Sequence, residues 1–161
     1  KSNLNFNSMF NNQYIKANLY SRLGISGTWY LAFRDIPKLI KKYKKGNLAL
    51  DFGCGTGRSS RFLKSLDLIV DAVDISQEMI HKACQIDQSI HYSIITQNKI
   101  PQKSNFYDVV FSSLVLFEIS SVDELVKIFK EVHRVLKCNG VFIIVTGSTE
   151  MYRLFRISCG F

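Results

Sequence analysis

The chain has 161 residues, of which 47% are apolar and 21% charged, and its formal net charge is +8. This length suits one domain with a substantial buried core, and the composition is that of a globular protein. No apolar run approaches the ~20 residues that a membrane-spanning helix needs, so we expect no membrane span. The four cysteines lack a C-x-x-C pair and nearby histidines, so we expect reduced thiols, a cytoplasmic protein and no metal.

The positive charge is concentrated at the start of the chain. Residues 1–46 hold nine Lys and Arg against the single acid Asp35, whereas residues 47–161 hold twelve of each sign. A basic segment beside a neutral body can attract nucleic acid, an anionic membrane surface or an acidic substrate. A solvated, lysine-rich helix end at residues 38–45 is the simpler explanation, and charge alone does not establish a nucleic-acid partner.

The first 46 residues predict a helical cap in front of a separate body. A polar arm over residues 1–13 precedes a helix with apolar Ile15, Leu19 and Leu23 on one side. A second helix is expected from about Thr28 to Tyr43, and Pro37 predicts a kink or a break in it. We therefore divide the chain into a basic cap, residues 1–46, and a body, residues 47–161.

A glycine-rich stretch opens the body. Residues 48–52 predict a short buried strand, and Gly53, Gly55 and Gly57 follow it at every second position, before a helix expected over residues 58–66. Such glycines remove side chains from the turn, so that a ligand can approach the backbone closely. The spacing differs from the G-x-G-x-x-G of dinucleotide sites, and Asp51 adds a negative charge. These residues favour a ligand that carries a cation over a pyrophosphate.

Residues 50–57, Leu-Asp-Phe-Gly-Cys-Gly-Thr-Gly, resemble motif I of the class I S-adenosylmethionine-dependent methyltransferases, written roughly L-D-x-G-C-G-T-G. The resemblance implies a Rossmann-like, doubly wound, mostly parallel sheet that binds S-adenosylmethionine and releases S-adenosylhomocysteine. It places Asp51 near the methionine amino group of the cofactor. The cofactor-binding residues implied in this stretch are Asp51, Gly53, Cys54, Gly55, Thr56 and Gly57.

The second predicted strand, residues 68–73, ends in another acid. Asp74 lies 21 residues beyond Gly53, the separation at which a carboxylate accepts hydrogen bonds from a ribose. Ser76 is a good N-cap for the helix that follows. The run Val-Asp-Ile-Ser-x-x-Met, residues 73–79, also resembles the next motif of the family, which implies that Ile75 packs on adenine and that Met79 belongs to the site.

The third predicted strand, residues 90–95, is followed by Thr96, Gln97 and Asn98. The family pattern here resembles D-A-E-x-L-P, in which the first acid often hydrogen-bonds the adenine amino group. This chain has Thr96 instead of that acid. Since the three side chains still offer neutral acceptors, we keep all three as candidate adenine contacts.

The fourth predicted strand covers residues 106–113 and resembles the F-D-x-V-x-S segment of the family. Its carboxyl end lies beside the first strand in this topology, so Ser112 and Ser113 are expected to face the reaction centre. Many relatives carry histidines shortly afterwards, where this chain has Glu118. Glu118 is therefore a weak candidate base, while His81 and His133 are weaker because both fall inside predicted helices.

A helix starting at Ser121, with Glu124 completing a capping box, leads to the turn at residues 137–140, where Asn139 or Gly140 is expected to be left-handed. A fifth strand is predicted over residues 141–145. The complete family sheet resembles seven strands, and residues 147–161 leave no room for strands six and seven, so we expect a sheet truncated after strand five. Its open edge would invite self-association.

These features predict an enzyme that transfers a methyl group from S-adenosylmethionine to an unidentified, small-molecule acceptor. The alternative is a regulatory module that keeps the fold and binds the cofactor without transferring the methyl group, because of Thr96 and the missing histidine. An NAD-dependent oxidoreductase is disfavoured by the glycine spacing.

Overall fold

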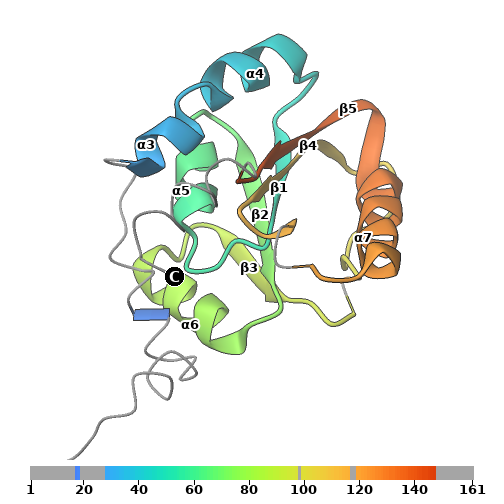
Figure 1. Ribbon diagram of the computed structural model, residues 1–161. Coiled ribbons are helices and arrows are strands. Elements are labelled where there is room, and N and C mark those ends of the chain that lie inside the picture. Colours follow the sequence, from blue (N-terminus) through green and yellow to red (C-terminus); the bar gives the residue numbers. More distant parts are fainter. Residues whose placement is uncertain (1–16, 19–27, 98, 117–118, 148–161) are drawn as a thin grey trace, which may run out of the picture.

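The computed structural model describes residues 17–18, 28–97, 99–116 and 119–147, and its centre is a five-stranded sheet. The strand order is β3-β2-β1-β4-β5, and every neighbouring pair is parallel. This confirms the predicted Rossmann-like class (Figure 1). The strands are β1 (Leu48–Phe52), β2 (Ile69–Asp74), β3 (His91–Ile94), β4 (Tyr107–Ser113) and β5 (Leu136–Val145).

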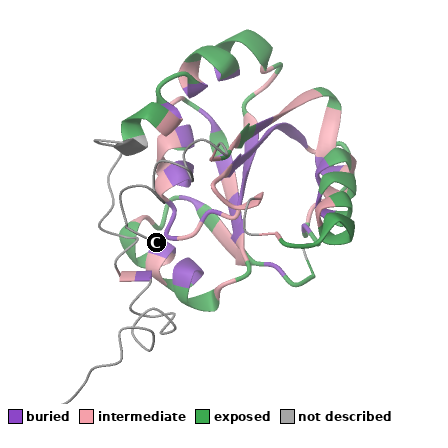
Figure 2. Cartoon of the chain, in the orientation of Figure 1, coloured by how far each residue is buried: buried purple, intermediate pink, exposed green. Residues whose placement is uncertain are grey.

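Helices cover both faces of the sheet. Figure 1 shows α5 and α6 on one side and α7 on the other. The described helices are α3 (Thr28–Phe33), α4 (Ile36–Tyr43), α5 (Arg58–Lys64), α6 (Gln77–Ile86) and α7 (Val122–Val135). Side chains alternate across each strand, so the two faces of the sheet contribute to two separate apolar cores. Figure 2 shows buried residues along the central strands and exposed residues on the outward turns of α4, α6 and α7.

One core holds Phe33 of α3, Ile36 and Ile40 of α4, and apolar residues of α5 and α6. The other is closed by Ile128 and Val132 of α7. The helices α3 and α4 thus pack into the same core as the sheet.

Local sequence signals explain where the helices begin. The hydroxyl of Ser76 accepts from the N–H of Met79 at 3.3 Å, and that of Ser121 accepts from the N–H of Glu124 at 3.4 Å. Pro37 lies in the first turn of α4, which is separated from α3 by residues 34–35. The predicted caps and the predicted break at Pro37 are confirmed.

The start of the fifth strand was predicted wrongly. β5 begins at Leu136 instead of residue 141, because Leu136 pairs with Tyr107 before an irregular stretch restores the register at Val109 and Val141. Asn139 has φ +69° there, which confirms a left-handed residue in the turn. The other predicted strands and helices of the body differ from the observed ones by two residues or fewer at each end.

The outer edge of β5 pairs with no other strand among the described residues. Self-association through this edge stays a prediction. The first predicted cap helix lies outside the described residues except for residues 17–18. Within the described parts of the chain, no helix is long and apolar enough to cross a membrane.

Candidate functional site

The candidate site lies at the carboxyl ends of the three central strands. In the sheet register Asp51 of β1 stands between Ala72 of β2 and Phe111 of β4. The glycine loop, residues 53–57, leaves β1 at this point and leads into α5. Asp74, at the end of β2, and Ser112 and Ser113, at the end of β4, share this edge.

At two positions of the glycine loop, the backbone angle and the neighbouring atoms allow only glycine. Gly53 and Gly57 have φ +76° and +79°, in the left-handed region. A Cβ atom on Gly53 would lie 2.3 Å from Val115 Cγ2, and one on Gly57 would lie 2.4 Å from the hydroxyl of Tyr92. The loop is therefore held between the end of β4 and the side chain of Tyr92 on β3.

Most described N–H groups of the loop already have partners. Those of Gly53 and Cys54 donate to the carbonyl of Val73 at 2.8 and 3.0 Å, and that of Gly57 donates to Cys54 at 2.9 Å. A ligand can therefore approach the backbone of the loop closely but finds few free N–H donors there. A phosphate binds through free N–H donors, whereas the ammonium group of an amino acid does not need them.

The side chains of Cys54 and Thr56 are 5% and 3% exposed. Burial raises the pKa of the Cys54 thiol well above its ordinary value, so the thiol stays protonated. Contact of these two residues with a cofactor would therefore pass through their backbone.

Asp51 is a fully buried carboxylate with one unsatisfied oxygen. Its Oδ2 accepts hydrogen bonds from the hydroxyls of Ser59 and Ser60, both at 2.6 Å. Its Oδ1 has no partner among the described residues. Burial raises the pKa of Asp51 to about 6, while the two serine hydroxyls act to lower it. Because a buried carboxylate is stabilised by a cation, Oδ1 fits the ammonium group of an amino acid.

Asp74 is held by the backbone on both sides. Its Oδ2 accepts from the N–H of Gly55 at 2.8 Å, and its Oδ1 accepts from the N–H of Ser76 at 2.9 Å. Each carboxylate oxygen can accept a further hydrogen bond. The carboxylate is therefore fixed in place with capacity left for two ribose hydroxyls.

The predicted adenine contacts lie close to Asp74. Ile75 is 70% exposed, whereas Met79 is buried at 7%. Thr96 and Gln97 are exposed, and the N–H of Ile95 donates to the carbonyl of Asp74 at 3.0 Å, which brings their segment to the β2 end. Asn98 lies outside the described residues. The roles of all five residues stay predictions.

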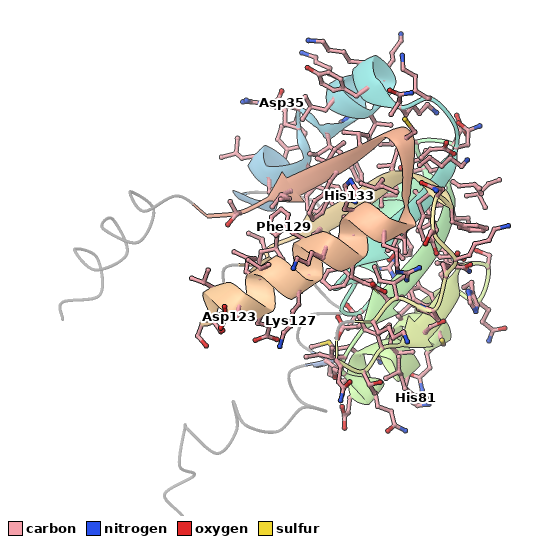
Figure 3. All side chains as sticks on the ribbon, turned by 90° about the vertical axis from the view of Figure 1, so that its right-hand side faces the viewer. Asp35, His81, Asp123, Lys127, Phe129 and His133 are labelled. Carbon is pink, nitrogen blue, oxygen red and sulfur yellow. The ribbon has the colours of Figure 1, made fainter. Side chains whose placement is uncertain are left out.

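The end of β4 carries two hydroxyls that lack partners. The Oγ atoms of Ser112 and Ser113 are buried and have no hydrogen-bond partner among the described residues. Together with Asp51 Oδ1 they are polar atoms at one edge that a bound molecule could satisfy. Glu118, the weak candidate base, lies outside the described residues. His81 and His133 are exposed on the outer surfaces of α6 and α7 (Figure 3).

Four residues that support the site were missed from the sequence: Ser59, Ser60, Tyr92 and Val115. The two adjacent serines in the first turn of α5 carried a signal, since hydroxyls on a helix face turned to the sheet need a buried partner. Tyr92 and Val115 carried none, because their contacts with the glycines arise only from the three-dimensional packing.

A hollow of about 400 Å³ lies elsewhere, against α6. It is lined by side chains such as His81, Lys82 and Gln85 and by Ala17. The glycine loop is not among its lining residues. The site described above therefore rests on its polar atoms and backbone shape, independently of this hollow.

Comparisons with known proteins agree with this geometry. A family model described as "Methyltransferase domain" matches residues 50–144, more than half of the chain. A malonyl-[acyl-carrier protein] O-methyltransferase of Enterobacter lignolyticus is 32% identical over 101 residues, which cover 63% of this chain and 39% of that protein. The mitochondrial arginine-hydroxylase NDUFAF5 of Mus musculus is 29% identical over 143 residues, covering 88% of this chain and 37% of that protein.

Among solved structures, the PH0226 protein from Pyrococcus horikoshii OT3 superposes with a TM-score of 0.70 and 30% identity. The match covers 84% of this chain and 63% of that one. The chain spans less than two fifths of the two curated relatives named above.

Proposed function

Because the chain belongs to the class I S-adenosylmethionine-dependent methyltransferase family, we propose that it binds S-adenosylmethionine beside the glycine loop and transfers the methyl group to a small-molecule acceptor. One observation carries the proposal: Asp51 and Asp74 lie at one sheet edge, one with an unsatisfied oxygen and the other fixed by the loop. An ammonium group suits the first carboxylate, and two ribose hydroxyls suit the second.

The remaining side chains would contact different parts of the cofactor. The exposed face of Ile75 would support the adenine ring, and Thr96, Gln97 and Asn98 would meet its polar edge. The glycine loop would admit the methionine part close to Asp51. Ser112 and Ser113 would lie nearest the reacting atoms, since they end the strand beside β1.

S-adenosylmethionine supplies an activated methyl group on a sulfonium and leaves as S-adenosylhomocysteine. The chain's own contribution is to hold donor and acceptor in line and to keep water out. Such positioning supplies up to ~7 to 11 kcal/mol of a reaction barrier. No described residue stands at the site as a general base, and the assignment of Glu118 stays a prediction.

The acceptor is proposed only as a class. The names of the matched relatives point in different directions, one to a malonyl carrier-protein methyltransferase and one to an arginine hydroxylase. The regulatory module without transfer activity gains no support from them, since both are named as enzymes. A cytoplasmic location belongs to the same proposal and is supported by the free thiols of Cys54, Cys84 and Cys138.

Titration calorimetry with the purified chain tests the cofactor. We expect S-adenosylmethionine and S-adenosylhomocysteine to bind, and NAD to give no heat of binding. Binding of NAD alone would overturn the proposal.

The ribose contact is tested by Asp74→Ala, which should weaken cofactor binding by at least ~1.5 kcal/mol, because charge-assisted hydrogen bonds are lost. Asp87→Ala, which removes a partly exposed carboxylate that pairs with Lys64 at the end of α6, is the control and should bind the cofactor normally. An unchanged dissociation constant in Asp74→Ala would show that Asp74 is not the ribose ligand.

Transfer itself is tested by incubating the chain with tritium-labelled S-adenosylmethionine and a metabolite extract. We expect S-adenosylhomocysteine to form together with a labelled product, and Asp74→Ala to reduce both. Cofactor binding without turnover across broad acceptor panels would favour the regulatory module instead.

A further inference from the structure

The outer surface of α4 and the residues that flank this helix carry a dense group of cations. Arg34, Lys38, Lys41, Lys42 and Lys45 are all exposed, and we call this surface the basic face. The one acid beside them, Asp35, pairs with Arg34 at 2.8 Å. None of the four lysines forms an ion pair with the described residues. Figure 3 shows side chains projecting outward from α4 near the labelled Asp35.

Large apolar side chains of α3 and α4 are exposed as well. Tyr30, Leu31, Leu39 and Tyr43 are 54%, 62%, 37% and 45% exposed. The opposite side of α4 is already used, since Ile36 and Ile40 are buried in the core against the sheet. The exposed leucines and tyrosines are therefore surplus to the packing of the domain.

The position of the basic face separates it from the candidate cofactor site. The turn after α4 leads to the amino end of β1, and a Cβ on Gly46 would lie 2.3 Å from the carboxylate of Asp108, at the start of β4. The glycine loop leaves the opposite end of β1. The α4 part of the basic face therefore lies toward the amino end of β1, whereas Phe33 of α3 lies 5.8 Å from Arg58, which follows the glycine loop.

We propose that the basic face docks the chain onto an anionic membrane surface. Lysines beside a negatively charged lipid leaflet gain electrostatic free energy without any fixed geometry, which suits side chains that form no ion pair with the described residues. Tyrosine and leucine are favoured at the lipid interface, where the ring or the aliphatic group enters the headgroup region. The uneven charge of the chain agrees, because all of its excess lies in residues 1–46.

A nucleic acid explains this surface less well. Sequence-tolerant binding of single strands stacks bases on aromatic rings, and base reading uses Arg, Asn or Gln side chains. The basic face has leucines among its cations, its one arginine is paired with Asp35, and Lys42 already lies over the ring of Tyr43 at 4.9 Å.

Vesicle sedimentation with the full chain tests the proposal. We expect binding to phosphatidylcholine vesicles that contain phosphatidylserine, little binding to pure phosphatidylcholine, and weaker binding as salt rises. Each lysine at an anionic surface contributes about fivefold in affinity. The double change Lys41→Gln with Lys42→Gln should therefore weaken binding by about 25-fold.

The matched control is Lys127→Gln with Lys130→Gln, which removes the same charge from exposed positions on α7. It should change vesicle binding by less than about twofold, since screening removes distant charges. Circular dichroism shows whether both doubles stay folded. Equal losses in the two doubles, or no preference for phosphatidylserine, would overturn the proposal. So would an oligonucleotide that binds more tightly than the vesicles and is sensitive to Lys41 and Lys42. Cofactor binding plays no part in these readouts.

Discussion

Two buried carboxylates on the neighbouring strands β1 and β4 differ in how many of their oxygens the fold hydrogen-bonds. Asp108, at the start of β4, is 6% exposed and has both oxygens bonded, one to the N–H of Leu48 at 3.0 Å and one to Lys137 Nζ at 2.9 Å. Asp51, at the other end of β1, is fully buried with Oδ1 unbonded within the described residues. One carboxylate is completed by the fold, whereas the other is left for something outside it.

The difference separates residues that stabilise the chain from residues that serve a ligand. Burying an ionised carboxylate is unfavourable unless cations or donors compensate it. The fold compensates Asp108 at the amino end of the sheet and compensates Asp51 only in part at the carboxyl end. Five measurements, from the largest expected effect to the smallest, would break or sharpen this contrast.

Asp108→Ala should lower the free energy of unfolding by about 3 kcal/mol, because it leaves the Lys137 ammonium and the Leu48 N–H without their partner. Urea denaturation measures this loss. Cofactor affinity of the folded fraction should stay unchanged. A stability close to wild type would mean that the two bonds to Asp108 contribute little.

Asp51→Asn should affect cofactor binding more than stability. The free energy of unfolding should stay the same or rise, because a partly compensated buried charge is removed. Affinity for S-adenosylmethionine should fall by about 2 kcal/mol, roughly 30-fold, because the ammonium loses a charged partner. Calorimetry and urea denaturation on the same preparation provide both numbers. Loss of stability with normal cofactor affinity would contradict the contrast.

The pH dependence of the free energy of unfolding should report on Asp51. The pKa of Asp51 is raised from 3.8 to about 6 by burial, against the two serine hydroxyls. The unfolded chain therefore releases this proton at lower pH than the folded chain. The wild type should lose stability relative to Asp51→Asn as pH rises from about 4 to about 6, and lose no more above that.

Cofactor affinity, in contrast, should rise as pH rises. Binding needs ionised Asp51, so affinity should fall by up to about tenfold for each pH unit below about 6 in the wild type but not in Asp51→Asn. Asp74 and Arg58 also act on the pKa of this carboxylate, and both are retained in the two proteins. Parallel profiles for the two proteins would rule out Asp51 as the titrating group.

Ser113→Ala should have the smallest effect. Its hydroxyl has no partner among the described residues, so the change should alter stability by less than about 0.5 kcal/mol and weaken cofactor or acceptor binding by about 1 kcal/mol. Ser60→Ala is the matched control, because that hydroxyl donates to Asp51 and its loss should lower stability by about 1 kcal/mol. A destabilised Ser113→Ala would show that its hydroxyl has a structural partner.

Much of the fold was predictable because its signals are local. The caps at Ser76 and Ser121 and the break at Pro37 depend on residues within one turn of each other. The start of β5 was not predictable in this way. The N–H groups of Asn105 and Phe106 bind the carbonyls of Arg134 and Val135 at 3.0 and 2.8 Å, which continues the pairing to the end of α7. That contact joins segments far apart in the sequence.

The candidate site was likewise predictable where its signals are local and unpredictable where they depend on packing. The positions of Asp51, Asp74 and the glycines follow from strand ends that the sequence marks. The unbonded oxygen of Asp51 does not follow, because it depends on Ser59 and Ser60 both turning to the same atom. Nor does the close approach of Tyr92 to Gly57, which leaves no room for a Cβ atom on Gly57.

The two backbone bonds to Asp74 have a consequence for the entropy of binding. Since the N–H groups of Gly55 and Ser76 hold both oxygens, the carboxylate loses its rotamer freedom when the chain folds. A ribose that arrives later meets a preorganised acceptor and immobilises no side chain there. Because the N–H of Gly55 holds Asp74 Oδ2, a distortion of the glycine loop at Gly55 would also displace this carboxylate.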